Sequence, residues 1–366
     1  KVGDSYLGKG EQVWLEDVRE FSTLAMMELI REDLLALGVK MDVFYSEKSL
    51  YGTGLIEAAI EDLKSKGLIY QGVLEPPKGK KPEDWEPREQ TLFRSTDHGD
   101  DVDRPVQKSD GSWTYFAPDI AYHYDKVQRG FDQLIDVFGA DHGGYVKRMK
   151  AAVSALSNDK TSLDIKLTQL VKLFKNGAPF KMSKRAGTFV TLRDLVDQVG
   201  ADATRFVMLT RKNDAPLDFD FDKVMEQTKE NPVFYVQYAH ARICSVMRKA
   251  QLAGVAVEDA VLKAADFAGL TDAAELTLAA KLAEFPRLIE IAARSNEPHR
   301  IAFYLYDLAS EFHALWNKGN EQPELRFLQE GNLATSQAKI ALIRATAVVI
   351  SNGLGILGVQ PAQEMR

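Results

Sequence analysis

Residues 134–142 are LIDVFGADH, a short apolar run that ends in a glycine and two polar side chains. The run predicts a buried strand over 134–138, followed by a helix over 143–157. A second strand is predicted over 165–173 and a further helix over 191–199. Strands that alternate with helices in this way indicate parallel βαβ units and an α/β fold.

The order of these elements also predicts where a ligand binds. In parallel sheets, ligands lie beyond the carboxyl ends of the strands. We therefore expect residues 139–142 and the loop after Phe174 to form one candidate site.

The residues before this α/β part predict a mixed α+β region. An apolar stripe over 11–37 fits two helices, residues 41–45 a short strand, and residues 55–66 a helix that ends at Gly67. Residues 77–90 are rich in Pro, Gly, Lys and Glu, which is typical of an exposed loop.

After Asp222 the strand pattern ends and amphipathic helices follow, which predicts a separate helical bundle. We therefore divide the chain into two domains, 1–222 and 223–366. The alternating acids of 218–222 lack the glycine of a calcium loop, so we interpret them as a strand or turn that joins the domains. The expected helices are 223–250, 273–295, 299–318, 324–330 and 334–356.

Composition places the chain among globular proteins of more than one domain. It has 366 residues, of which 45% are hydrophobic and 27% charged, and no apolar run approaches the length of about 20 residues that spans a bilayer. Cys244 is the single cysteine, which excludes an internal disulfide and a multi-thiolate metal site. The sequence carries no signal-peptide pattern, and we expect a cytoplasmic protein without a membrane partner.

The net charge of −7 hides a basic segment. The segment between Tyr145 and Arg185 contains ten basic side chains and only two acidic ones, and this excess of positive charge attracts polyanions. The simpler interpretation of each single lysine is a solvated helix face. The basic residues are Lys147, Arg148, Lys150, Lys160, Lys166, Lys172, Lys175, Lys181, Lys184 and Arg185.

The densest part of this segment is KMSKR at 181–185, in a loop entered through 177–179. Two ammonium groups on a loop can stabilise the negative charge that develops on a triphosphate in the transition state. A P-loop is excluded as an explanation, because the pattern Gly-x-x-x-x-Gly-Lys-Ser/Thr does not occur here.

KMSKR after such a strand resembles the second signature of class I aminoacyl-tRNA synthetases, although that signature usually ends in Ser where this chain has Arg185. Residues 189–195, 200–206 and 231–242 resemble arginyl-tRNA synthetases, and the likeness extends over nearly the whole chain from Trp14 onward. The resemblance implies a partial Rossmann-type catalytic domain with an α+β insertion, followed by an all-α anticodon-binding bundle.

The resemblance also implies roles for the residues around the nucleotide. Lys181 and Lys184 would grip the pyrophosphate of ATP as the catalytic cations, and Met182 and Ser183 would line the ATP site between them. The segment at 139–142 would contact the ATP ribose or the arginine through Asp141 and His142, while a structural turn remains the alternative for His142.

A guanidinium site is implied at Tyr115 and Asp119, four residues apart. A carboxylate can accept a bidentate pair from the arginine side chain, and a tyrosine can add a hydrogen bond or an aromatic face. From pattern alone, Asp119 is the N-cap of the helix that follows, and this alternative stays open.

On the first long helix of the bundle, Gln237, Tyr238 and Arg242 lie close together. An aromatic ring beside an arginine suits an unstacked base, and the resemblance places this helix against anticodon bases. The alternative is ordinary packing of a tyrosine and an arginine on a bundle helix.

Taken together, the resemblance implies an arginine–tRNA ligase that uses ATP with Mg²⁺, L-arginine and tRNA(Arg), acts as a monomer, and needs tRNA before activation. The first class I signature, His-x-Gly-His, does not occur in the chain, and residue 1 is Lys. We therefore expect a fragment that does not form arginyl-adenylate by itself. The alternatives are a non-catalytic RNA-binding module and a small-molecule adenylylating enzyme.

Overall fold

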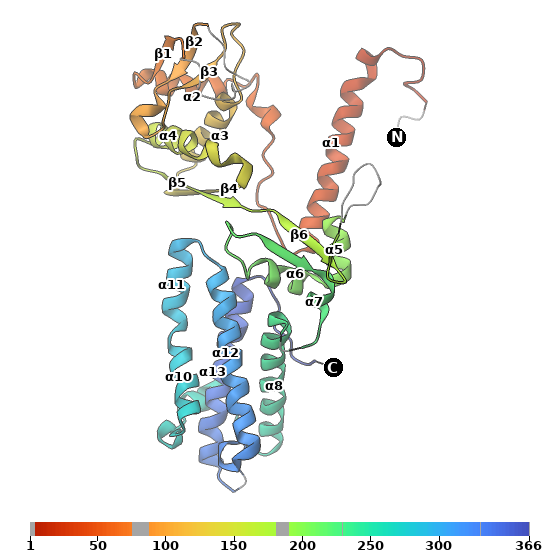
Figure 1. Ribbon diagram of the computed structural model, residues 1–366, viewed down its shortest axis with the longest axis vertical. Helices are drawn as coiled ribbons and strands as arrows, with labels where there is room; N and C mark the ends of the chain where they lie inside the picture. Colours follow the sequence, from red (N-terminus) through yellow and green to blue (C-terminus); the bar gives the residue numbers. More distant parts are fainter. Residues whose placement is uncertain (1–3, 75–87, 181–189, 229, 330, 366) are drawn as a thin grey trace. The chain divides into compact units, whose positions relative to one another are not determined.

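The computed structural model describes residues 4–74, 88–180, 190–228, 230–329 and 331–365. The chain forms two compact units (Figure 1). One unit, which we call the α/β unit, contains residues 41–170 and 213–216. The other, the bundle unit, contains residues 1–40, 171–212 and 217–366. Each unit is described by itself.

The α/β unit contains the predicted βαβ element. Strands β4 and β5 pair in parallel from Gln133↔Ser162 to Gly139↔Thr168, and helix α4 connects them. The expectation of a parallel α/β arrangement is thereby confirmed. The bounds are β4 Gln133–Gly139, α4 Val146–Ser157 and β5 Ser162–Thr168.

A small antiparallel sheet and two further helices complete this unit. Strand β2 lies between β1 and β3, and α2, α3 and α4 pack their apolar faces into one core around Phe93, Phe116 and Met149. The bounds are α2 Leu55–Ser65, β1 Ile69–Gly72, β2 Gln90–Phe93, β3 Arg104–Gln107 and α3 Phe116–Gln128. The predicted loop at 77–90 lies largely outside the described residues.

The single strand predicted over 165–173 is wrong. Strand β5 ends at Thr168, and a new strand, β6, begins at Val171 and pairs in parallel with β8 of the bundle unit. A continuous run of alternating side chains does not show at which residue the chain stops pairing with one strand and begins to pair with another. The bounds are β6 Val171–Lys175, β7 Ala178–Pro179 and β8 Leu217–Asp220.

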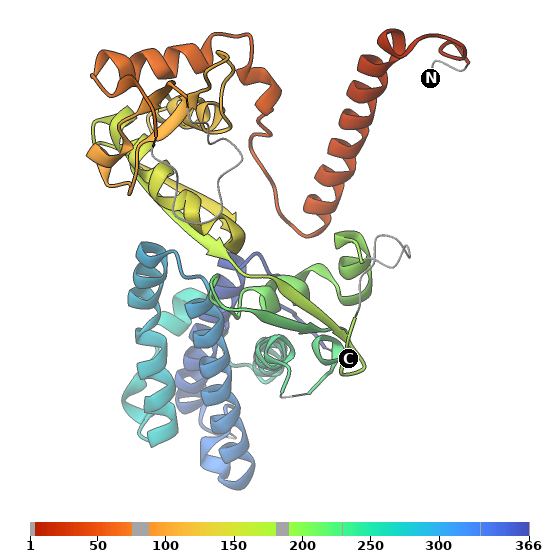
Figure 2. The ribbon, with the colours of Figure 1, turned by 45° about the horizontal axis from the view of Figure 1, so that its top comes forward.

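Two predictions near the N-terminus are corrected. The apolar stripe over 11–37 forms one unbroken helix, α1 (Glu11–Ala36), rather than two (Figure 2). Residues 41–45 form no strand, because within the described chain no neighbouring strand pairs with them. Tyr45 instead packs its ring against Tyr122, with 4.6 Å between the ring centroids.

The bundle is built from long helices that lie side by side in Figure 1. Pro232 begins α8, so the helix predicted over 223–250 divides into α7 and α8, and Asp220 caps α7 with its side chain. The helix predicted over 273–295 divides at Glu284, two residues before Pro286. The bounds are α5 Leu192–Val199, α6 Ala201–Met208, α7 Phe221–Met225, α8 Pro232–Leu252, α9 Asp259–Lys263, α10 Ala273–Ala283, α11 Phe285–Ser295, α12 His299–Glu321 and α13 Leu333–Ile356.

One further expectation is corrected in this region. Residues predicted as a helix over 324–330 form only the short 3₁₀ turn Pro323–Leu325 within the described chain. Helix α13 is long and apolar enough to meet the length and hydropathy criteria for a membrane span. In the bundle, 56% of its apolar window is buried, as is usual for the central helix of a bundle.

Candidate functional site

Asp119 lies in the first turn of α3, but it does not cap the helix. Tyr115 occupies the N-cap position, and no side chain caps this end. The half-buried Asp119 instead accepts a hydrogen bond at Oδ2 from the hydroxyl of Tyr145, at 2.6 Å. The N-cap interpretation of Asp119 is therefore wrong, and its carboxylate has a tertiary role.

The bond between Asp119 and Tyr145 connects two of the predicted site segments. Tyr145 ends the 3₁₀ turn Ala140–Tyr145, which directly follows the carboxyl end of β4. The same turn contains Asp141 and His142. The start of α3 and the loop beyond β4 therefore meet at one place, where ligands of parallel sheets bind.

Asp119 has an unusual electrostatic environment. Burial raises the pKa of Asp119, and the negative charges of Glu47 and Asp136 raise it further, while the hydrogen bond from Tyr145 and the charge of His123 oppose the change. The net effect is a raised pKa. A cation placed against Asp119 would stabilise its charged form.

Glu47 and Tyr51 belong to this environment, and the sequence analysis did not identify them. Glu47 begins a 3₁₀ turn (Glu47–Leu50), and its Oε1 accepts from the hydroxyl of Tyr51 at 3.5 Å. Burial raises the pKa of Tyr51, and Glu47, Asp119 and Tyr115 raise it further through their charges. Two carboxylates and two tyrosines therefore face a common region, for which the local sequence offers no signal.

A buried histidine, His123, links α3 to β4. In His123, Nε2 lies 2.8 Å from Asp136 Oδ2, and Nδ1 lies 2.8 Å from the backbone carbonyl of Asp119. Both partners are oxygen acceptors, so His123 connects α3 to β4 through its two ring nitrogens. Lys126 Nζ also contacts Asp136, at 3.0 Å. Burial raises the pKa of Asp136, but His123 and Lys126 outweigh burial and lower it.

Asp141 and His142 point into solvent just beyond β4. Their side chains are 82% and 62% exposed, and 3.7 Å separates Asp141 Oδ2 from His142 Nε2. Both side chains are therefore accessible to a ligand that binds at the end of the sheet.

The cationic loop with Lys181, Met182, Ser183 and Lys184 lies outside the described residues. The chain enters it through β7, which pairs with β6. It leaves the loop at the capping box of α5, where Thr191 and Asp194 bond each other's backbone N–H groups. These anchors belong to the bundle unit.

On α8, the side chains predicted to bind RNA differ in their contacts. Arg242 lies 4.3 Å from the ring centroid of Tyr238 and 4.5 Å from that of Trp316 on α12. It also donates to the hydroxyl of Tyr238 at 2.6 Å. Its other amino group lies 3.2 Å from Nδ1 of His313, whose pKa burial lowers to about 4. Arg242 is thus held between two aromatic rings.

Gln237 is placed differently from its neighbours on α8. Its side-chain amide donates to the carbonyl of Gln360 and accepts from the N–H of Ala362, both at 2.7 Å. The residue is 9% exposed. Both polar groups of Gln237 therefore hold the C-terminal segment and are not presented to a ligand.

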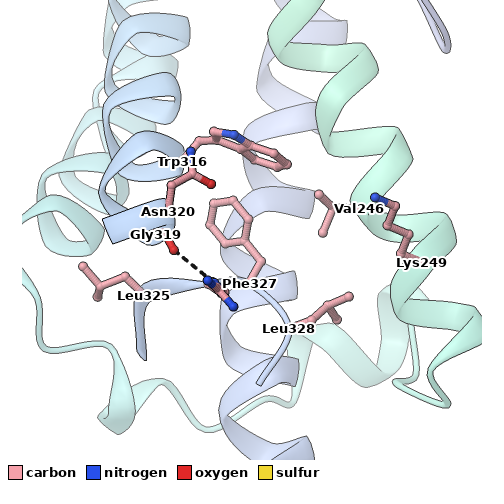
Figure 3. Close-up of a pocket in the computed structure, with 9 residues that line it drawn as sticks. Val246, Lys249, Trp316, Gly319, Asn320, Leu325, Phe327 and Leu328 are labelled. Carbon is pink, nitrogen blue, oxygen red and sulfur yellow. Dashed lines mark hydrogen bonds between the residues drawn. The ribbon is translucent and has the colours of Figure 1, made fainter. Parts of the chain in front are cut away.

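Two hollows adjoin Trp316. One, of about 460 Å³, is lined by Tyr238, Arg242, Arg248 and Trp316. The other, of about 230 Å³, is lined by Trp316, Phe327 and Lys249 among others, and Figure 3 shows the Phe327 ring directed toward the indole. Aromatic walls beside cationic side chains suit flat, polar-edged rings such as bases.

Comparison with known proteins shows to which family the chain belongs. Residues 7–247 match the family model described as tRNA synthetases class I (R), catalytic domain, which covers more than half of the chain. This chain belongs to the class I tRNA synthetases (R). Residues 236–365 of the synthetase chain match the DALR anticodon binding domain, so Tyr238 and Arg242 fall inside both matches. The family predicted from the sequence is confirmed.

Relatives and solved structures give the same assignment. The synthetase chain is 79% identical to an arginine–tRNA ligase of Roseobacter denitrificans and 76% identical to one of Ruegeria pomeroyi. In both, the match covers all of this chain and 63% of the relative. A putative arginyl-tRNA synthetase of Campylobacter jejuni superposes with a TM-score of 0.80 at 31% identity, over 99% of this chain and 73% of that one. The chain thus spans about three fifths of the length of its curated relatives.

Proposed function

We propose that the complete protein is an arginine–tRNA ligase, which activates L-arginine with ATP and transfers it to tRNA(Arg). The observation that carries the proposal is the half-buried Asp119 carboxylate, held at one oxygen by Tyr145 and flanked by Glu47. The names of the relatives support the same activity.

Asp119 is the residue that we propose to bind the guanidinium group. Within the described part of the chain, no hydrogen-bond donor reaches its second oxygen, Oδ1. A guanidinium offers paired N–H donors that match a carboxylate, and its charge offsets the repulsion between Asp119 and Glu47. Tyr115, a residue that is 76% exposed, would cover the guanidinium from the solvent side.

ATP, which brings Mg²⁺ with it, is the proposed co-substrate. Asp141 and His142 would contact it at the carboxyl end of β4. Lys181 and Lys184, with Met182 and Ser183 between them, remain the proposed catalytic loop. Ammonium groups there would stabilise the charge that develops on the leaving pyrophosphate when the arginine carboxylate attacks the α-phosphate.

The helical domain is the proposed site of the tRNA anticodon. We retain Tyr238 and Arg242 as direct contacts, since an aromatic ring and a guanidinium plane both stack on bases. Gln237 is now proposed to act indirectly, because it fixes the C-terminal segment that borders the same hollow through Met365. The domain boundary at 222/223 stays a prediction, and it falls within α7.

The activity can be tested by pyrophosphate exchange with the complete protein. Each of the 20 amino acids is supplied in turn with ATP, with and without tRNA. The proposal expects exchange with arginine and no other amino acid, and expects it to require tRNA. Exchange driven by another amino acid, or none under any condition while tRNA binding is retained, would overturn it.

A further inference from the structure

Tyr145 is held in one orientation by its surroundings. Its ring packs edge-on against Phe116, with 6.0 Å between centroids and 86° between planes. The guanidinium of Arg148 lies 4.7 Å from the centre of the same ring. Because Tyr145 ends the turn that leads directly into α4, its backbone is fixed as well. The hydroxyl therefore meets Asp119 in a prearranged position.

A prearranged donor at one oxygen determines the direction of the whole carboxylate. With Oδ2 of Asp119 bound to Tyr145 at 2.6 Å, rotation about the side-chain bond would break that contact. The plane of the carboxylate, and with it the direction in which Oδ1 accepts, is thereby restricted. A guanidinium is planar and rigid, so its bidentate binding is sensitive to this direction.

We propose that Tyr145 is a positioning residue of the arginine site, whose hydroxyl orients the Asp119 carboxylate toward the guanidinium. This inference rests on the proposed binding of arginine at Asp119. Tyr145 itself acts through Asp119 and needs no contact with the substrate.

The charges around Asp119 show why ionisation needs support. Glu47 from the turn before α2 and Asp136 from β4 repel a negative charge on Asp119, and burial disfavours it most. His123 on the same helix attracts it, and the hydrogen bond from Tyr145 opposes the effect of burial. Tyr51 also faces the group. Loss of the Tyr145 hydroxyl should therefore raise the pKa of Asp119 further.

The test is Tyr145→Phe in the complete protein, which keeps the ring and its packing and removes the hydroxyl. We expect the KM for arginine to rise about tenfold, the usual effect of losing a hydrogen bond to a charged group. The KM for ATP and kcat at saturating arginine should keep their wild-type values. The acid limb of kcat/KM for arginine should move to higher pH, because Asp119 must be ionised to bind.

Tyr70→Phe is the matched control, since Tyr70 also donates to a carboxylate, Asp103, at 2.8 Å in the same unit. It should leave the KM for arginine and the pH profile unchanged. The melting temperature of Tyr70→Phe measures how much stability is lost with such a hydrogen bond, so a folding defect in Tyr145→Phe can be recognised by comparison.

The outcomes separate this inference from the proposed function. If Asp119→Asn raises the KM for arginine but Tyr145→Phe changes neither the KM nor the acid limb, the role of Tyr145 is refuted and the arginine site stands. If Asp119→Asn leaves arginine kinetics at wild-type values, the arginine site itself is refuted, and the role of Tyr145 with it.

Discussion

The buried ion pair between α10 and α13 offers a direct test of what holds the bundle together. Glu275 and Lys339 bond each other with side chains that are 3% and 4% exposed. Glu275 also accepts from the backbone N–H of Asp272 in the capping box of α10. Replacing Lys339 by Met removes the ammonium group and leaves a buried carboxylate without its counter-charge.

The cost of this replacement follows from burial. Breaking a buried pair by removing one partner costs about 3–5 kcal/mol, because the remaining charge stays desolvated. The double variant Glu275→Gln, Lys339→Met removes both charges and keeps an acceptor for the capping box. It should recover most of the loss and lie within about 1–2 kcal/mol of the wild type.

Urea unfolding followed by far-ultraviolet circular dichroism measures these free energies of unfolding. The control is Arg344→Met on the same helix, which breaks the solvent-exposed pair with Asp259 and should change stability far less. If Lys339→Met is no more destabilising than Arg344→Met, or the double variant is no more stable than Lys339→Met, the reasoning about burial is refuted.

Three further predictions concern stability. Burial raises the pKa of Asp100, but the bonds from Arg104 outweigh burial, and the net pKa is lowered. The stability that Asp100 contributes is therefore present above its ordinary pKa and is lost as the pH falls below that value. Acid titration of Asp100→Asn should lack this loss of stability. Burial lowers the pKa of His313 to about 4, so the stability of the protein should fall as the pH drops from 6.5 toward 4. In His313→Gln this fall in stability should be smaller, as melting curves at each pH would show. Gly353→Ala places a Cβ 2.7 Å from Leu305 and should cost about 1–3 kcal/mol in urea unfolding, and an unchanged midpoint would contradict the packing argument.

The sequence predicted those parts of the fold whose pattern is local. The helices at 299–318 and 334–356 were found because their apolar residues repeat with the helical period, and they correspond to α12 and α13. The division of 165–173 between β5 and β6 was missed, because the two strands follow each other with two residues between them. The change of partner strand depends on tertiary contacts alone.

The candidate site shows the same limit. Asp119 was identified through family resemblance, whereas the pattern alone favoured an N-cap, and the structure instead bonds it to Tyr145, 26 residues away. Glu47 and Tyr51 join the site from a turn with no motif of its own. The position of Gln237 on its helix suggested an RNA contact, but its partners come from the C-terminal segment 123 and 125 residues later.

We propose above all that Asp119 selects a positively charged guanidinium group. Citrulline has nearly the same shape as arginine but carries a neutral ureido group, so the ratio of kcat/KM for arginine over citrulline measures the effect of charge. We predict that Asp119→Asn in the complete protein lowers this ratio by about 10- to 100-fold, the expected effect of losing a charge-assisted pair. An unchanged ratio in Asp119→Asn would contradict the account.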